Sequence, residues 1–296
     1  MADGDVKNRV GVLGATSLVG ACLLPLLTEA GWQVSAFSRQ VVDGFGFGDG
    51  VEWQLAISSP THLVDEAGIS FWVCAAPIWV LPDYFDLLNL KGVRRVVVLS
   101  STSRFTKHAS IDPEEQAIAL QLADAEVRVQ KWAESRGVEW VILRPTLIYG
   151  LGRDKNITEI ARFIRRFGFF PLFGKANGLR QPIHAADVAG ACLAALQENG
   201  AANRAYNISG GETLTYRNMV THVFSALDRH PYLLTVPLWT FRLTLMVLRS
   251  LPRYRQWSLA MAERMNQDLV FDHSEAVRDL NFKPRAFKLS AADLPK

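Results

Sequence analysis

The segment that most constrains the fold is a short apolar strand that runs directly into a glycine turn and a helix. Residues 9–13 read RVGVL and are followed at once by Gly14. A helical pattern then covers about 17–30 and stops at Gly31, which is a typical C-terminal cap. Gly20 lies six residues after Gly14, where a missing side chain lets helix and strand approach. This context predicts a dinucleotide-binding unit rather than a purely structural turn.

Strands and helices alternate over the first 145 residues. Alternation of this kind gives a parallel sheet with helices on both faces and right-handed crossovers. We therefore predict a doubly wound parallel α/β fold, with its ligand outside the carboxyl ends of the strands. A long helix should begin at Asp112 and end near Gly137. The further strands are expected at 33–37, 51–55, 69–75, 93–99 and 138–143.

The pattern changes after Gly150. Residues 1–150 are expected to form the dinucleotide-binding domain, and 180–210 to return to it. The remaining segments, 151–179 and 211–296, should form a smaller, mainly helical substrate lobe. Helices are expected near 156–167 and 187–196, with a strand at 206–208.

Composition excludes several classes of protein. The chain has 296 residues, a net charge of +3, 49% apolar residues and 21% charged residues, which is typical of a globular chain. Three far-apart cysteines without a C-x-x-C pair predict no disulfide framework or zinc site. The six histidines show no metal-ligand spacing. The small, dispersed charge does not indicate nucleic acid, and the cysteine usage favours a reducing, cytoplasmic compartment.

The first helix offers free N–H groups and a positive dipole end to a pyrophosphate. Ser17 stands where a middle glycine is usual, and its hydroxyl can cap the helix or bond a phosphate oxygen. The second strand ends in Phe37-Ser38-Arg39, without the acid that would bind a ribose 2′-hydroxyl. Arg39 and Ser38 therefore favour NADP over NAD, although Arg39 could also be a solvated surface residue. The expected cofactor loop is Gly14, Ala15, Thr16, Ser17, Leu18, Val19 and Gly20.

Five segments, in order, carry a resemblance to a known family. They are GATSLVG at 14–20, LSSTS at 99–103, LRPTLIYG at 143–150, RQPIHAADVA at 180–189 and YNISGGE at 206–212. The chain resembles the extended and atypical short-chain dehydrogenase/reductases, the NAD-dependent epimerase/dehydratase family, over nearly its whole length. The resemblance implies a Rossmann-type domain. It also implies an oxidoreductase or epimerase acting on a nucleotide- or lipid-linked sugar or a similar carbonyl compound, and is compatible with a homodimer.

One departure concerns the active site of that family, which uses Y-x-x-x-K on the helix after the fifth strand. Glu126 resembles the family's glutamate four residues after the lysine, and this register puts Ile118 and Leu122 at the Tyr and Lys positions. No other Y-x-x-x-K occurs in the chain. Because the standard proton relay is absent, a non-catalytic NADP-binding sensor or scaffold is the alternative function.

Candidate catalytic residues follow the fifth strand. The resemblance puts Thr102 at the catalytic Ser/Thr position, although such a hydroxyl can simply cap backbone groups. Lys107 could transfer protons if a desolvated pocket lowers its pKa, or it could be a solvated loop lysine. Arg180 and His184 are expected to bind substrate. Further cofactor contacts are expected at the strand ends, from Ala75, Ala76, Pro77, Ser100, Ser101, Pro145, Thr146 and Leu147.

An apolar stretch over 232–251 contains Arg242, Arg249 and Pro237, so it is too charged and interrupted to predict a membrane-spanning helix. We prefer a helix packed on the substrate lobe, with Arg242 and Arg249 reaching an anionic substrate. A peripheral membrane contact, with Trp239 beside arginines at the lipid surface, is the alternative.

Overall fold

A computed structural model describes residues 9–39, 50–56, 68–239 and 259–296. Its centre is a seven-stranded sheet in the order β11-β6-β5-β4-β1-β2-β3, and neighbouring strands pair in parallel. The doubly wound parallel fold predicted from the sequence is confirmed. The strands are β1 (Arg9–Leu13), β2 (Gln33–Ser38), β3 (Val51–Leu55), β4 (Phe71–Cys74), β5 (Arg95–Leu99), β6 (Glu139–Pro145) and β11 (Arg204–Ile208).

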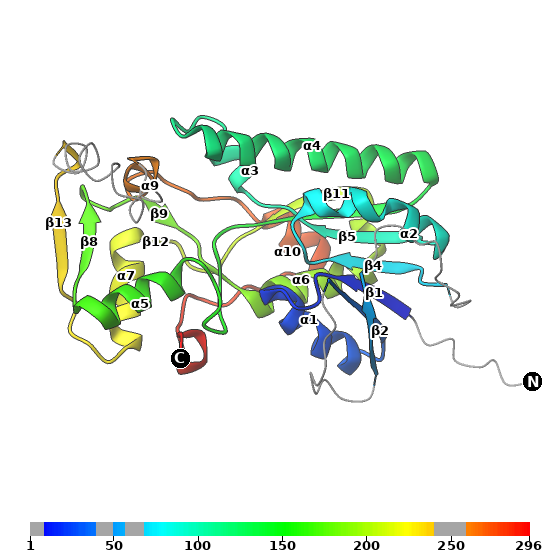
Figure 1. The fold of residues 1–296 in the computed structure, drawn as a ribbon, viewed down its shortest axis with the longest axis horizontal. Helices are drawn as coiled ribbons and strands as arrows, with labels where there is room; N and C mark the ends of the chain where they lie inside the picture. Colours follow the sequence, from blue (N-terminus) through cyan, green and yellow to red (C-terminus); the bar gives the residue numbers. More distant parts are fainter. Residues whose placement is uncertain (1–8, 40–49, 57–67, 240–258) are drawn as a thin grey trace, which may run out of the picture.

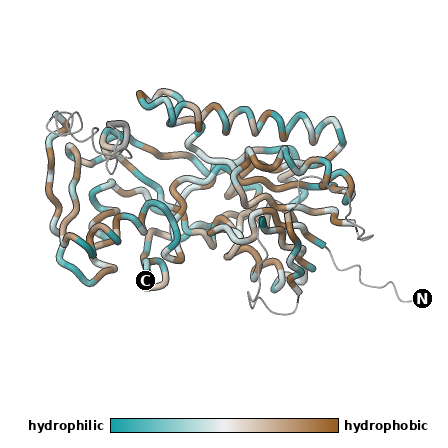
Figure 2. The backbone as a smooth tube through the Cα atoms, viewed as in Figure 1, coloured by the Kyte–Doolittle hydropathy of each residue, from teal (hydrophilic) through white to brown (hydrophobic). Residues whose placement is uncertain are grey.

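Helices cover both faces of this sheet (Figure 1). Alternate residues of β5 show the two sides, because Val97 belongs to one buried cluster and Val96 and Val98 to the other. Burial on both faces explains why the central strands are almost continuously apolar, as the hydropathy colouring shows (Figure 2). One face carries α1 (Leu18–Glu29), α6 (Ala185–Gln197) and α10 (Ser274–Leu280), and the other η1 (Ile78–Tyr84), α2 (Phe85–Leu90) and α4 (Pro113–Arg136).

The ends of the two long helices near the site follow from local sequence. The Ser17 side chain caps α1 by accepting a hydrogen bond from the Gly20 N–H at 3.0 Å. Asp112 caps α4 by accepting from the Glu114 N–H at 3.0 Å, and Gly137 ends α4 at φ +66°. Both helices therefore begin and end close to where the sequence predicts.

The C-terminal lobe lies beyond the carboxyl ends of the strands and has its own buried cluster. It mixes helices with small sheets, whereas the sequence predicts mainly helix. The pairs are β8 with β13, β9 with β12, and β7 with β10. The elements are β7 (Ile148–Tyr149), α5 (Ile157–Phe167), β8 (Phe170–Phe173), β9 (Leu179–Arg180), β10 (Ile183–His184), β12 (Leu214–Thr215), α7 (Tyr216–Ala226), β13 (Leu233–Val236) and α9 (Leu259–Arg264).

The chain returns to the sheet domain twice. Strand β11 adds to the edge of the sheet beside β6, and α6 packs on α1. Later, Ala276 and Leu280 of α10 join the cluster beneath the sheet, as does Phe282. Assigning all of 211–296 to the lobe is therefore wrong, because these apolar side chains are buried against the sheet domain.

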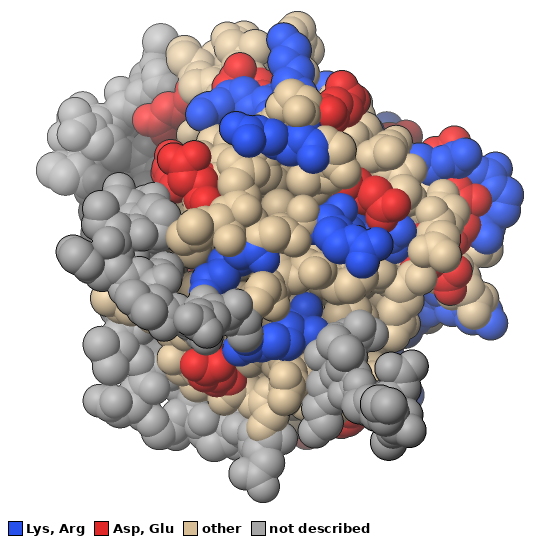
Figure 3. Space-filling view, turned by 90° about the vertical axis from the view of Figure 1, so that its right-hand side faces the viewer, with Lys and Arg blue, Asp and Glu red and all other residues tan. Residues whose placement is uncertain are grey.

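The apolar stretch at 232–251 begins as strand β13 rather than as a helix, and it pairs with β8. The predicted helical faces over 240–251, including Arg242 and Arg249, lie outside the described residues. Within the described part of the chain, no helix is long and apolar enough to cross a membrane. On the face opposite the lobe, acidic and basic side chains are interspersed (Figure 3).

Candidate functional site

The turn between β1 and α1 is shaped by two close backbone approaches. Gly14 has φ +76°, and a Cβ on it would lie 2.5 Å from the Ala76 nitrogen. A Cβ on Gly20 would lie 2.4 Å from the Gly14 carbonyl oxygen. A side chain at Gly20 would therefore meet the backbone of the turn at Gly14 and Ala15. The close approach at Gly14 is to Ala75 and Ala76, which directly follow β4.

The start of α1 fits a dinucleotide pyrophosphate. Leu18 and Val19 lie in the first turn of α1, so their N–H groups have no acceptor within the helix. The positive end of the helix dipole lies at the same place. Ser17 already caps Gly20, so its hydroxyl oxygen completes this turn and its hydroxyl hydrogen can point to a phosphate. The neighbouring β2 ends in buried Ser38 and exposed Arg39. An exposed guanidinium at this place fits an additional phosphate.

A second loop touches the glycine turn at residues 14–20 from the lobe side. Residues 150–152 all have positive φ, at 132°, 54° and 60°. After them, the Arg153 guanidinium donates to the Thr16 carbonyl oxygen at 2.9 Å. A Cβ on Gly152 would clash with the carbonyl of Leu294, so the C-terminal segment packs directly on this loop. Sequence reasoning missed this contact, because the two segments it joins are 137 residues apart.

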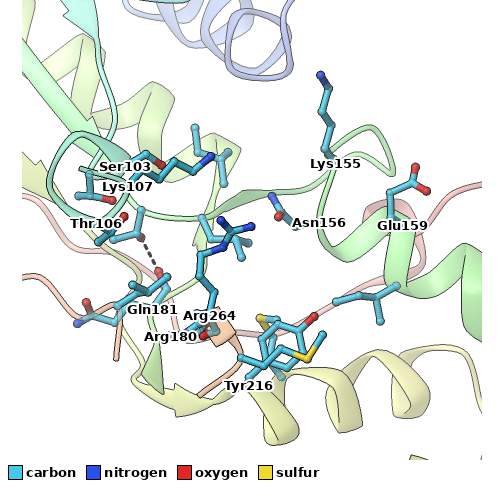
Figure 4. A pocket seen from close by; sticks show the side chains of 18 of the residues that line it. Ser103, Thr106, Lys107, Lys155, Asn156, Glu159, Arg180, Gln181, Tyr216 and Arg264 are labelled. Carbon is cyan, nitrogen blue, oxygen red and sulfur yellow. Dashed lines mark hydrogen bonds between the residues drawn. The ribbon is translucent and has the colours of Figure 1, made fainter. Parts of the chain in front are cut away.

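A cavity of about 690 Å³ lies between the carboxyl ends of β5 and β6 and the C-terminal lobe (Figure 4). Its sheet-domain side is formed by residues after β5, including α3 (Ser103–Thr106), and residues after β6. The lobe supplies side chains from α5, β8, α7 and α9. Of the residues singled out in the sequence, those that line it are Ser101, Thr102, Lys107, Thr146, Leu147 and Arg180.

Two hydroxyl groups lie at the end of β5, and they differ in what they can donate. The Thr102 hydroxyl is buried and donates to the Pro145 carbonyl oxygen at 3.2 Å. The Ser101 oxygen accepts from the Ser103 N–H at 3.1 Å, so its own hydrogen stays available. Thr102 can therefore accept a hydrogen bond from an alcohol as it stands, whereas Ser101 can donate one to a carbonyl oxygen.

Lys107 reaches the cavity from the end of α3, and its side chain is about one quarter exposed. Burial lowers the pKa of Lys107, and the nearby Arg264 guanidinium lowers it further. The Glu115 carboxylate lies behind both cations, 3.9 Å from the Lys107 ammonium and in direct contact with Arg264. Glu115 lies in the first turn of α4, is buried, and also accepts from the Ser110 hydroxyl at 2.8 Å.

The helix α4 carries no polar side chain at the family's Tyr and Lys positions. Leu122 is buried among the sheet residues, and Ile118 packs partly buried against the same cluster. Neither residue lines the cavity. These apolar side chains pack in the sheet domain.

Glu126, one turn further along α4, is the centre of a buried ionic network. Its carboxylate, only 1% exposed, accepts from Arg144 at 2.6 and 3.1 Å, from Ser100 at 2.5 Å, and from Arg104. The predicted cofactor residue Ser100 is therefore engaged with Glu126. In the sequence, Glu126 served only to set the helix register. The arginine of the LRP segment could have indicated its partner.

The two predicted substrate-binding residues behave differently. Arg180 lines the cavity, but its guanidinium donates to the carbonyl oxygens of Leu179 and Gln267, each at 2.7 Å, and stacks over the Tyr216 ring. His184 does not line the cavity, which corrects the sequence prediction. Its two ring nitrogens contact the Ala186 N–H at 3.1 Å and the Asp293 carboxylate at 3.0 Å. His184 therefore joins the start of α6 to the C-terminal segment.

The described residues contain no group of three or more His, Cys, Asp or Glu side chains that could hold a metal ion. All three cysteines are free thiols, and burial raises the pKa of Cys74 and Cys192 to about 12. Neither of these two thiols lines the cavity, and both are fully buried.

Comparison with known proteins agrees with this architecture. Residues 83–209 match the model of the NAD dependent epimerase/dehydratase family. UDP-glucose 4-epimerase of Vibrio cholerae is 25% identical over 283 residues, which cover 82% of this chain and 84% of that protein. NADH dehydrogenase (ubiquinone) 1 alpha subcomplex subunit 9 of Dictyostelium discoideum is 21% identical, covering 69% of this chain and 60% of its own.

Solved structures share the fold over almost the whole chain. UDP-glucuronic acid 4-epimerase from Bacillus cereus, solved in complex with NAD, has a TM-score of 0.71 at 13% identity, covering 96% of this chain and 95% of that one. The order of the sheet, the glycine turn at the start of α1 and the match over residues 83–209 all indicate the same Rossmann-type architecture. Residues 83–209 therefore carry the similarity to the NAD-dependent epimerase/dehydratase family, and the fold of such proteins is shared over almost the whole chain.

Proposed function

We propose that this chain is an NAD(P)-dependent oxidoreductase or epimerase acting on a carbonyl or alcohol compound, of which a nucleotide- or lipid-linked sugar is an example. The observation that carries the proposal is that Thr102 and Lys107 line one cavity outside the carboxyl ends of β5 and β6. Ligands of doubly wound sheets bind at that edge. Residues 1–150 with 180–210 would hold the cofactor, and the lobe would hold the substrate.

The cofactor loop is assigned to Gly14–Gly20, with Ala75, Ala76 and Pro77 beside it. NADP is favoured by the exposed Arg39 and by the absence of an acid at the end of β2. The similar Bacillus cereus enzyme was solved with NAD, so a direct comparison of the two cofactors is needed.

A bound nicotinamide ring supplies or accepts hydride. In the reducing direction, the Lys107 ammonium donates a proton to the oxygen that gains charge, and Ser101 or Thr102 orients that oxygen. The lowered pKa of Lys107 suits this role, because a group that titrates nearer neutrality exchanges protons more readily. Activity should then fall as pH rises through the pKa of Lys107.

The test compares turnover with binding in the purified full-length chain. NADPH and NADH are offered with a panel of carbonyl compounds, and nicotinamide absorbance and cofactor affinity are both followed. Lys107→Gln should lower kcat by at least about 100-fold with unchanged cofactor affinity. Lys131→Gln, at an exposed position on α4, is the control and should keep full activity. Turnover that survives Lys107→Gln with an unchanged pH profile would refute the role of Lys107.

The second candidate function is a non-catalytic NADP-binding sensor or scaffold. It is favoured by the apolar Ile118 and Leu122, which occupy the positions of the family's proton relay and pack into the core. Tight cofactor binding without turnover of any compound in the panel would support it.

A further inference from the structure

The cavity has an apolar wall built from the core of the C-terminal lobe. Phe170 and Phe173 of β8, Met219 of α7 and Met265 are almost fully buried, yet they line the cavity. Phe163 of α5 extends this wall and contacts the Phe170 ring edge-on, with centroids 5.5 Å apart. A wall of aromatic rings and thioethers favours the apolar part of a ligand, because binding removes the apolar surfaces of both from water and brings them into van der Waals contact.

The opposite side of the cavity is positively charged. Lys107 and Arg264 lie there together with the Asn156 amide (Figure 4). One carboxylate, Glu115, contacts both cations, so a net positive charge remains. Glu159 is the acidic residue among the described lining residues, and its carboxylate accepts from Arg162 at 2.6 Å. This side is suited to one anionic group.

The apolar wall is poorly suited to a nucleobase. The N–H groups of Phe170, in β8, and of Gly174, directly after it, already donate to the carbonyl oxygens of Tyr232 and Val236. Pro171 of β8 has no N–H to offer. The Phe173 carbonyl oxygen accepts from the Asn266 amide at 2.8 Å. The Tyr216 hydroxyl cannot by itself satisfy the several donors and acceptors of a base. Burying those groups without partners disfavours binding.

We propose that the substrate taken by this cavity is an anionic amphiphile, with a phosphate or carboxylate group at Arg264 and Asn156 and an apolar chain or ring system on the wall. This inference rests on the proposed function, since the reacting carbonyl or alcohol lies between the two parts, near Thr102 and Lys107. An anion at this place also favours the protonated form of Lys107, which is the form that donates a proton.

The test measures binding in the full-length chain, so it gives a result whether or not turnover is found. Calorimetric titrations use n-octyl phosphate, octanoate, n-octanol, inorganic phosphate and UDP, all below micelle-forming concentrations. We expect n-octyl phosphate or octanoate to bind at least about tenfold tighter than n-octanol, which lacks the charge, and than inorganic phosphate, which lacks the chain. The ratio of the two anionic probes identifies the preferred head group.

Three variants separate the two parts of the site. Arg264→Gln should weaken the anionic probes about tenfold and leave n-octanol unchanged, whereas Phe163→Ala should weaken all three eight-carbon probes. Arg166→Gln, an exposed change on α5 outside the cavity, is the matched control and should change nothing. UDP binding tighter than n-octyl phosphate would overturn the proposal in favour of a nucleotide. Anionic probe affinities that neither Arg264→Gln nor Phe163→Ala lowers would overturn it as non-specific binding.

Discussion

The glycine turn at 14–20 and the segment at 100–126 both follow a central strand, but they are specified in different ways. In the first, the critical contacts are short-range or involve the adjacent strand end, such as Ser17 with Gly20 and Gly14 with Ala76. In the second, each functional group depends on a distant partner. Lys107 is near Arg264, and Glu126 binds Arg144.

The difference shows that close backbone packing fixes the residues of the glycine turn, whereas the positions on α4 are set only by burial against the sheet. Steric constraints fix Gly14 and Gly20, because a side chain at either position would meet backbone atoms. Positions 118 and 122 accept apolar residues because the sheet already buries that face of α4. Lys107, at the end of α3, instead brings a titratable side chain to the cavity.

The largest effect is expected in the second region. Glu126→Ala should lower the free energy of unfolding by about 3–5 kcal/mol, because it removes a buried carboxylate and leaves the half-buried Arg144 and Arg104 guanidinium groups without their partner. Urea denaturation measures this loss. Glu134→Ala, at an exposed position on the same helix, should cost little. Equal effects of the two changes would mean that the network contributes nothing.

In the first region, Gly14→Val should lower the free energy of unfolding by about 2–4 kcal/mol and abolish cofactor binding. It adds the strain of a positive φ to a clash with Ala76. The control is Gly31→Val, since Gly31 also has positive φ but no atom within 4 Å of its Cβ position. Denaturation and NAD(P) titration of both variants measure the difference, and equal destabilisation would rule out the close approach.

Arg39→Ala should cost ~1.5–3 kcal/mol of NADP binding, the scale of a hydrogen bond to a charged group. NAD binding should hardly change, because NAD lacks the 2′-phosphate. Fluorescence titration with both cofactors checks this, with the exposed Arg94→Ala as the control. If affinity for both cofactors falls equally, Arg39 does not read the 2′-phosphate.

The smallest effect concerns Asp293, which lies in the C-terminal segment that packs on the loop at 150–152. Burial raises the pKa of Asp293, but hydrogen bonds from Ser290 and from His184 outweigh it and hold that pKa below its usual value. A lowered pKa stabilises the fold above about pH 4, and this stabilisation is lost as pH falls through the folded-state pKa. Asp293→Asn should therefore cost about 1 kcal/mol near pH 6 and less near pH 3.

Denaturation of wild type and Asp293→Asn at both pH values measures this effect. A cost that is the same at pH 3 and pH 6 would show that the charge of Asp293 plays no part. Asp228→Asn, at an exposed position after α7, is the control.

The sequence by itself determined the parallel sheet, the ends of α1 and α4 and the glycine turn between β1 and α1. Local rules sufficed there, since Ser17, Asp112 and Gly137 act on their own helix ends. The strands of the sheet were readable because burial on both faces requires continuous apolar runs. The mixed lobe was not readable, because the paired residues of β8 and β13 are 63 positions apart and the run beginning at Tyr232 suits a helix or a strand alike.

Only the tertiary structure decided which polar residues share the cavity. It joined Lys107 to Glu115 and Arg264, took His184 out of the cavity to Asp293, and brought Arg153 onto the Thr16 carbonyl. These groups are separated by up to 157 residues along the chain, and their side chains follow no local periodicity. Their pairing depends on how the lobe packs against the sheet domain, because charge and hydrogen bonding act over a few ångströms of space and not along the sequence.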